Sequence, residues 1–197
     1  MPNWCNNTLS ISHEDPAMMK KFQSAWNEGH VMSEFIPIPQ DLKDTVAGFC
    51  GKGTPEQAEL EKKEAINLAK YGYKNWYDYA VGEWGTKWDF GNGDQSSGAI
   101  DDDQLSGEVT VSFCSAWSPP IGGYEKLAEL GFFIKATYFE GGCGFCGLWE
   151  DGSDECYDIE GNSEWVRNYI PQVIDLEYGI SESMAEWEEE NQEEEEA

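Results

Sequence analysis

The sequence predicts an α+β fold, and three observations support this prediction. Residues 108–114, EVTVSFC, alternate apolar and polar side chains as a half-buried strand does. Residues 16–26 instead place Met19, Phe22 and Trp26 at helical spacing. Segments of these two kinds follow one another along the chain, separated by residues that are typical of turns.

The first half of the chain begins with a strand and a helix and then continues into an insertion. Residues 4–12 alternate well enough to predict a strand, and the helix over 16–26 follows it. We expect residues from about 35 to 100 to form a helical insertion. Within it, Thr54 and Pro55 are a typical N-cap and first helical residue, so that a helix should follow them.

The second half of the chain is richer in strands. It predicts a strand over 108–114, a helix over 124–130, a strand over 132–140, a hairpin of 146–151 with 155–159, and a helix over 163–177. This order fits a ferredoxin-like βαββαβ antiparallel sheet with a helical insertion and a C-terminal hairpin. We expect a single domain over residues 1–180, followed by an acidic, disordered tail over 181–197.

The charge is strongly negative and unevenly distributed. The formal net charge is −27, and residues 151–197 contribute 17 acidic side chains against one basic side chain, Arg167. Such a field repels nucleic-acid phosphate and anionic membranes and attracts basic surfaces, for example the DNA-binding groove of a nuclease or a regulator. We therefore expect a basic partner protein and no direct binding to nucleic acid or membrane. The alternative is that the acidity only keeps the protein soluble.

The sequence carries no signal for export or for a membrane span. The opening residues lack a basic region followed by an apolar run, and no stretch approaches the roughly 18 apolar residues of a transmembrane helix. The six cysteines are not needed as disulfides in a chain with this much apolar material. We expect reduced thiols and a cytoplasmic location.

Three sequence blocks resemble a known family. MPNWCNNTLSIS at the N-terminus, NWYDYAVGEWGTKWDF from residue 75 and FCSAWSPP from residue 113 are together similar to the YubB ferredoxin-like domain family. The resemblance implies a ferredoxin-like fold without an iron–sulfur cluster, and an origin among the accessory proteins of phages and plasmids. It implies no established activity.

One cysteine cluster has the spacing of a metal or redox site. Cys143 and Cys146 form a C-x-x-C motif, and Cys156 follows ten residues later. A closed zinc site needs four ligands, and the chain has no second C-x-x-C and no nearby histidine. We favour small buried or turn cysteines over a zinc site. Since no Ser/His/Asp or Cys/His pattern is evident either, we expect no enzyme and no cofactor.

Two groups of residues are candidates for binding. The tryptophans Trp76, Trp84, Trp88 and Trp117 could line a pocket that stacks a ring, although we favour a core between the insertion and the sheet. The acidic candidates are Asp151, Asp154, Glu155 and Asp158.

These observations predict a non-enzymatic accessory protein that binds a basic surface of a host protein. It would act as an acidic mimic of DNA, in the host cytoplasm and in counter-defence. The alternative is a protein that binds or sequesters a small, nucleotide-like ligand with its aromatic residues. The sequence leaves the oligomeric state open.

Overall fold

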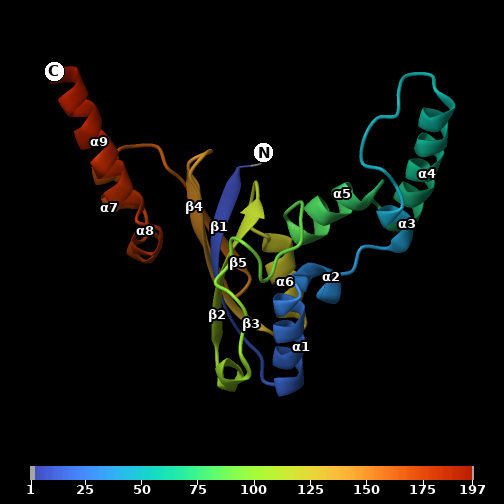
Figure 1. Ribbon diagram of the computed structural model, residues 1–197, viewed down its shortest axis with the longest axis horizontal. Helices are drawn as coiled ribbons and strands as arrows, with labels where there is room; N and C mark the ends of the chain where they lie inside the picture. The colour runs from blue at the N-terminus through green and yellow to red at the C-terminus, as the bar shows by residue number, and fades with distance from the viewer. Residues whose placement is uncertain (1–2, 197) are drawn as a thin grey trace.

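The computed structural model describes residues 3–196, which form one open antiparallel sheet flanked by helices (Figure 1). The strand order is β2-β1-β3-β4-β5, and every neighbouring pair is antiparallel. The strands are β1 (Trp4–Ser12), β2 (Val109–Ala116), β3 (Phe133–Glu140), β4 (Phe145–Glu150) and β5 (Ser153–Asp158). The α+β class is therefore confirmed.

One face of the sheet is covered by the two amphipathic helices α1 (Pro16–Asn27) and α6 (Ile121–Glu129). The alternation along β1 buries Leu9 and Ile11 on this face, where they join the main core with Trp26 of α1 and Trp149 of β4. Asp15 caps α1 by accepting a hydrogen bond from the backbone amide of Ala17.

The other face carries three C-terminal helices, α7 (Ser163–Tyr169), α8 (Gln172–Tyr178) and α9 (Ile180–Glu196). Because side chains alternate along a strand, Cys146 of β4 points to the side opposite Trp149. It forms a second core with one buried residue from each of these helices: Val166, Ile174 and Ile180. The sheet therefore lies between two helical layers, and the second layer covers β3 and β4.

The C-terminal segment differs from the disordered tail predicted over 181–197, because α9 is a continuous helix to Glu196. Ile180 is buried at its start, Met184 packs on the second core, and Glu188 accepts hydrogen bonds from the amide and hydroxyl of Ser163. Glutamate is also a strong helix former. These contacts offset the repulsion between the glutamates, from which disorder was predicted. Residue 197 lies outside the described range.

The segment between α1 and β2 contains short helices and one long one: α2 (Val31–Phe35), α3 (Gln40–Lys43), α4 (Pro55–Tyr71), α5 (Trp76–Tyr79), a π-helical segment (Ala80–Trp84) and a 3₁₀ helix (Asp102–Ser106). Helix α4 projects away from the sheet (Figure 1), and its buried residues are Leu60 and Asn67. We call residues 40–79 the arm. Thr54 caps α4 as predicted, accepting a hydrogen bond from the amide of Gln57.

The sheet order differs from the simple βαββαβ expectation. Between α1 and α6 the chain forms one strand, β2, where that pattern needs two. Residues 91–98 are rich in Gly, Asn and Ser, which have low β-propensity, and only Ser96 forms a bridge, to Phe113. Hairpin β4–β5 extends the sheet at the opposite edge, as the sequence predicts. Within residues 3–196, no helix is long and apolar enough to cross a bilayer.

Candidate functional site

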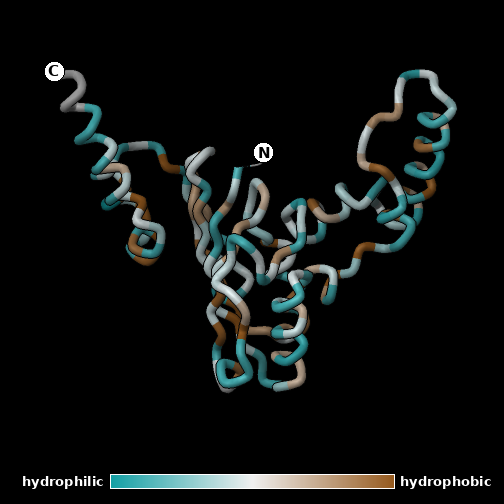
Figure 2. Tube along the Cα trace, in the orientation of Figure 1, coloured by the Kyte–Doolittle hydropathy of each residue, from teal (hydrophilic) through white to brown (hydrophobic). Residues whose placement is uncertain are grey.

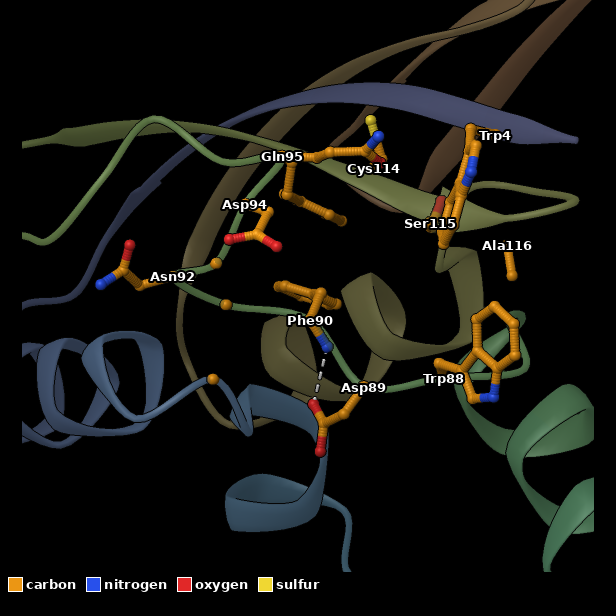
Figure 3. Close-up of a pocket in the computed structure, with 14 residues that line it drawn as sticks. Trp4, Trp88, Asp89, Phe90, Asn92, Asp94, Gln95, Cys114, Ser115 and Ala116 are labelled. Carbon is orange, nitrogen blue, oxygen red and sulfur yellow. Dashed lines mark hydrogen bonds between the residues drawn. The ribbon is translucent and has the colours of Figure 1, made fainter. Parts of the chain in front are cut away.

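A cavity of about 440 Å³ opens where the start of β1 meets the end of β2 and the loop that follows the π-helical segment (Figure 3). Its volume lies within the range of roughly 300–1,000 Å³ usual for ligand sites. Trp4 and Trp88 line it together, with ring centroids 5.8 Å apart and planes inclined by 40°. Each indole is 40% exposed. Aromatic side chains left this open beside a cavity are typical of binding surfaces.

The loop that carries Trp88 is held firmly by hydrogen bonds and ring stacking. The carboxylate of Asp89 accepts hydrogen bonds from the amides of Met32 (2.6 Å) and Ser33 (2.8 Å) at the start of α2. The next residue, Phe90, stacks on Phe113 of β2 with centroids 4.1 Å apart and planes 8° from parallel. The cavity wall is therefore ordered by contacts to α2 and to the core.

Glycine is required where this loop crosses the end of α1. Gly91 has φ +157°, and a Cβ there would lie 2.7 Å from both the Cα of Gly29 and the carbonyl oxygen of Trp26. That same carbonyl accepts a hydrogen bond of 2.7 Å from the amide of Asn92. The close approach fixes the position from which Asp94 and Gln95 extend beside the cavity.

The lining of the cavity carries negative charge and no basic side chain. The carboxylate of Asp89 accepts hydrogen bonds from the amides of α2. The side chains of Asp94 and Gln95, in contrast, have no hydrogen-bond or ion-pair partner in the part of the chain that the structure describes. Figure 3 shows Asp94 and Gln95 on one side of the space and the two indoles on the other. Lys87 lies with its ammonium 4.5 Å from the Trp88 centroid but does not line the cavity.

The four tryptophans predicted as a stacking wall lie in different environments. Trp84 is 3% exposed and donates its indole hydrogen to the carbonyl of Ile36 at 3.0 Å, so it belongs to the core. Trp76 is half-buried on α5 against Tyr77. Trp117 is exposed, with φ 73°, and lies outside the cavity lining.

Only Trp88 of that set lines the cavity, and its partner there is Trp4. The four indoles therefore do not form one wall, and of this set only Trp84 has the core position that was favoured. Helical and loop geometry turns neighbouring aromatics in different directions. Trp4 reaches the cavity through the sheet register, which pairs it with Ala116. A long-range register of this kind leaves no signal in the local sequence.

The four acidic candidates all lie in the β4–β5 hairpin but not as one cluster. Asp151 lies in the turn, and Asp154 accepts a hydrogen bond of 2.7 Å from the hydroxyl of Tyr138. Glu155 points to the other face of β5 and accepts one of 2.9 Å from Tyr157. Asp158 lies on the same face as Asp154, since the two are four residues apart on one strand.

The three cysteines proposed as a weak zinc site do not converge. Cys146 is fully buried beneath the C-terminal helices, and burial raises the pKa of its thiol to about 12. Cys143 is exposed in the β3–β4 turn, and Cys156 is exposed opposite Gly147, on the other face from Cys146. Within residues 3–196, no group of three or more His, Cys, Asp or Glu side chains is placed to hold a metal ion.

Comparison with known proteins adds little to this geometry. No family model matches the chain, and no curated protein matches it. Among solved structures, the crystal structure of protein api92 from Yersinia pseudotuberculosis, described with family model DUF1281, is similar at 10% identity and a TM-score of 0.41. The match covers 82% of this chain and 100% of that one. Likeness at this level carries no argument about function.

Proposed function

We propose that this protein is a non-enzymatic accessory protein that binds a basic surface of a host protein by mimicking the charge of DNA. The observation that carries the proposal is the density of carboxylates on α9. Residues 186–196 hold eight glutamates within one helix, and these eleven residues span about 15 Å at the helical rise. This is one negative charge per about 2 Å, close to the one per about 1.7 Å of duplex DNA.

The surroundings of α9 support this proposal. The exposed side chains of Glu182, Glu186, Glu189 and Glu190 lie on described turns of the helix, and Figure 2 shows hydrophilic residues along most of it. The one basic side chain in residues 151–197, Arg167, is directed toward the carbonyl of Ser181 at 3.4 Å. Arg167 also helps to lower the pKa of Glu188, so it is the one cation of this region that acts on the carboxylates of α9.

The absence of enzymatic activity is part of the same proposal. Each of the two histidines contacts another polar group of the chain. His13 contacts the carbonyl oxygen of Leu130 at 3.1 Å, and His30 lies 3.8 Å from the carboxylate of Glu28. Neither is hydrogen-bonded to a serine or cysteine among the described residues. All six cysteines are free thiols, which supports a reducing compartment and hence action in the host cytoplasm.

We also propose that the sheet is a reduced ferredoxin-like sheet. If the bridge at Ser96 is counted as the remnant of a second strand, the spatial order becomes β3, β1, β2 and then residue 96. In chain order this is strand 4, 1, 3, 2, with the β4–β5 hairpin added beyond β3. That arrangement supports the ferredoxin-like fold implied by the family resemblance.

The test is retention of host proteins from a lysate on the immobilised full-length chain, followed by elution in a salt gradient. We expect a basic DNA-handling protein that elutes at moderate salt and is displaced by duplex DNA, because both would occupy one groove. Removing residues 192–197 deletes four glutamates and should lower the association rate.

The matched control removes the same number of charges from the arm, with Glu56, Glu59, Glu61 and Glu64 each changed to Gln. This variant should bind like the unaltered protein. The mimicry would be contradicted by a partner that stays bound at saturating DNA. It would also be contradicted if the partner bound the truncated chain and the control variant equally well.

The alternative, a nucleotide-like ligand, retains one supporting observation, the Trp4–Trp88 pair at the cavity. A neutral nucleoside could stack there. A phosphate is disfavoured, because Asp89 and Asp94 line the same space without any basic side chain.

A further inference from the structure

We propose that the Trp4–Trp88 cavity is a receptor for one arginine side chain presented by the partner protein. This inference rests on the proposed function, since a basic surface supplies such side chains. It names a second contact region, separate from the carboxylates of α9. The cavity is formed by β1, β2 and the loop from Trp88 to Gln95, none of which belongs to the C-terminal helices.

The charge of the cavity selects a cation. Two carboxylates, Asp89 and Asp94, lie in the lining and no basic side chain does. Asp89 is compensated by backbone amides, but Asp94 has no partner in the described chain and remains available for a ligand. The net charge of −27 adds a field that concentrates cations at every exposed site of the molecule.

The aromatic lining favours a planar cation over a compact one. A guanidinium stacks flat on an indole and is less strongly hydrated than an ammonium, so it loses less on leaving water. Trp4 and Trp88, inclined by 40°, offer two ring surfaces beside one space. The ammonium of Lys87 lies 4.5 Å from the Trp88 centroid, so Trp88 already makes one cation–π contact, and Trp4 is the indole of the pair without such a contact among the described residues.

The polar side of the cavity suits a fork of N–H donors. Asp94 supplies carboxylate oxygens and Gln95 an amide oxygen, and both side chains lack partners within residues 3–196. Arginine presents five donors in one plane and binds a carboxylate through two of them, whereas lysine presents a point charge. We therefore expect the cavity to prefer arginine over lysine.

The test is a titration of the full-length chain, labelled with ¹⁵N, with N-acetyl-arginine N-methylamide, observed through the indole N–H signals. Trp4→Phe and Trp88→Phe identify the two signals. We expect saturable shifts of both, with weaker binding of the lysine analogue. Asp94→Asn should weaken the arginine probe roughly two- to five-fold, which is the effect of an exposed ion pair. Asp44→Asn, on the arm, is the matched control and should leave the affinity unchanged.

Equal affinity for the two amino-acid probes, an Asp94→Asn variant that binds like the control, or shifts with adenosine alone would each overturn the arginine receptor. The truncation of residues 192–197 keeps the two tests apart. If the arginine probe binds while partner capture is the same with and without residues 192–197, only the mimicry is lost. If capture depends on the tail while the probe causes no shifts, only the cavity proposal is lost.

Discussion

At the scale of single residues, burial separates the cysteines into two chemical classes. Cys5 and Cys146 are fully buried, and burial raises the pKa of each thiol from 9.0 to about 12. Cys50, Cys143 and Cys156 are exposed. The sequence predicted reduced thiols, and the structure gives no pair a disulfide. Which thiols are buried depends on strand register, because Cys146 and Cys156 lie on opposite faces of one hairpin.

These buried thiols predict a loss of stability at alkaline pH. Between pH 9 and about 12 the thiols ionise in the unfolded chain but stay protonated in the folded one. Their contribution is complete below pH 9 and is lost as the pH rises toward 12, by at most about 1.4 kcal/mol per pH unit for each thiol. Urea unfolding over this interval measures the effect. Cys5→Ala should lose less stability across the same interval, and an equal slope in both proteins would contradict the assignment.

At the scale of elements, α9 shows how a tertiary contact overrides local repulsion. The amide and hydroxyl of Ser163 donate to Glu188 at 2.7 and 2.8 Å, which joins the first residue of α7 to the middle of α9. These hydrogen bonds hold the pKa of Glu188 below its usual range. The stability they contribute is therefore present at neutral pH and is lost as the pH falls through the lowered pKa.

Removal of this carboxylate should release α9 locally. Glu188→Ala is expected to raise amide hydrogen exchange in residues 180–188 severalfold, because the contact to α7 is lost while helix propensity is kept. Glu189→Ala is the control, since Glu189 is exposed and has no hydrogen-bond partner in the described structure. Equal exchange in the two variants would mean that the apolar contacts of Ile180 and Met184 hold α9 alone.

The elements were predicted well where the local pattern is strong. The strands over 4–12 and 132–140, the helix behind Thr54 and the C-terminal hairpin all occur close to their expected limits. The acidic tail was harder, because its conformation depends on a contact with Ser163 that is distant in sequence. The cavity was out of reach for the same reason. Sequence identified Trp88 as a candidate but could not pair it with Trp4.

At the scale of the whole molecule, the net charge differs strongly between the arm and the C-terminal segment. Residues 40–79, the arm, hold six lysines and seven acidic residues and so carry a net charge of only −1, whereas residues 151–197 carry a net charge of −16. Figure 1 places α4 of the arm and α9 far apart, on opposite sides of the sheet. The repulsion is therefore concentrated in the C-terminal helices and the neighbouring hairpin.

This distribution predicts that salt stabilises the protein. Raising the ionic strength from about 0.01 M to about 0.15 M shortens the Debye length from about 30 Å to about 8 Å and screens the repulsion among the carboxylates. The Tm measured by calorimetry should rise over this range. The chain lacking residues 192–197 has four fewer negative charges and should show a smaller rise. A Tm that falls with salt would show that attractive ion pairs dominate.

The position of β5 gives its carboxylates a second consequence. β5 is the last strand of an open sheet, so one side of its backbone has no neighbouring strand in the described structure and is a template for another chain. Asp154, Glu155 and Asp158 place negative charge on both faces of this edge. A second copy approaching edge to edge would bring like charges together. The same residues that were first considered as a binding surface would thus oppose edge-to-edge pairing of two copies through β5.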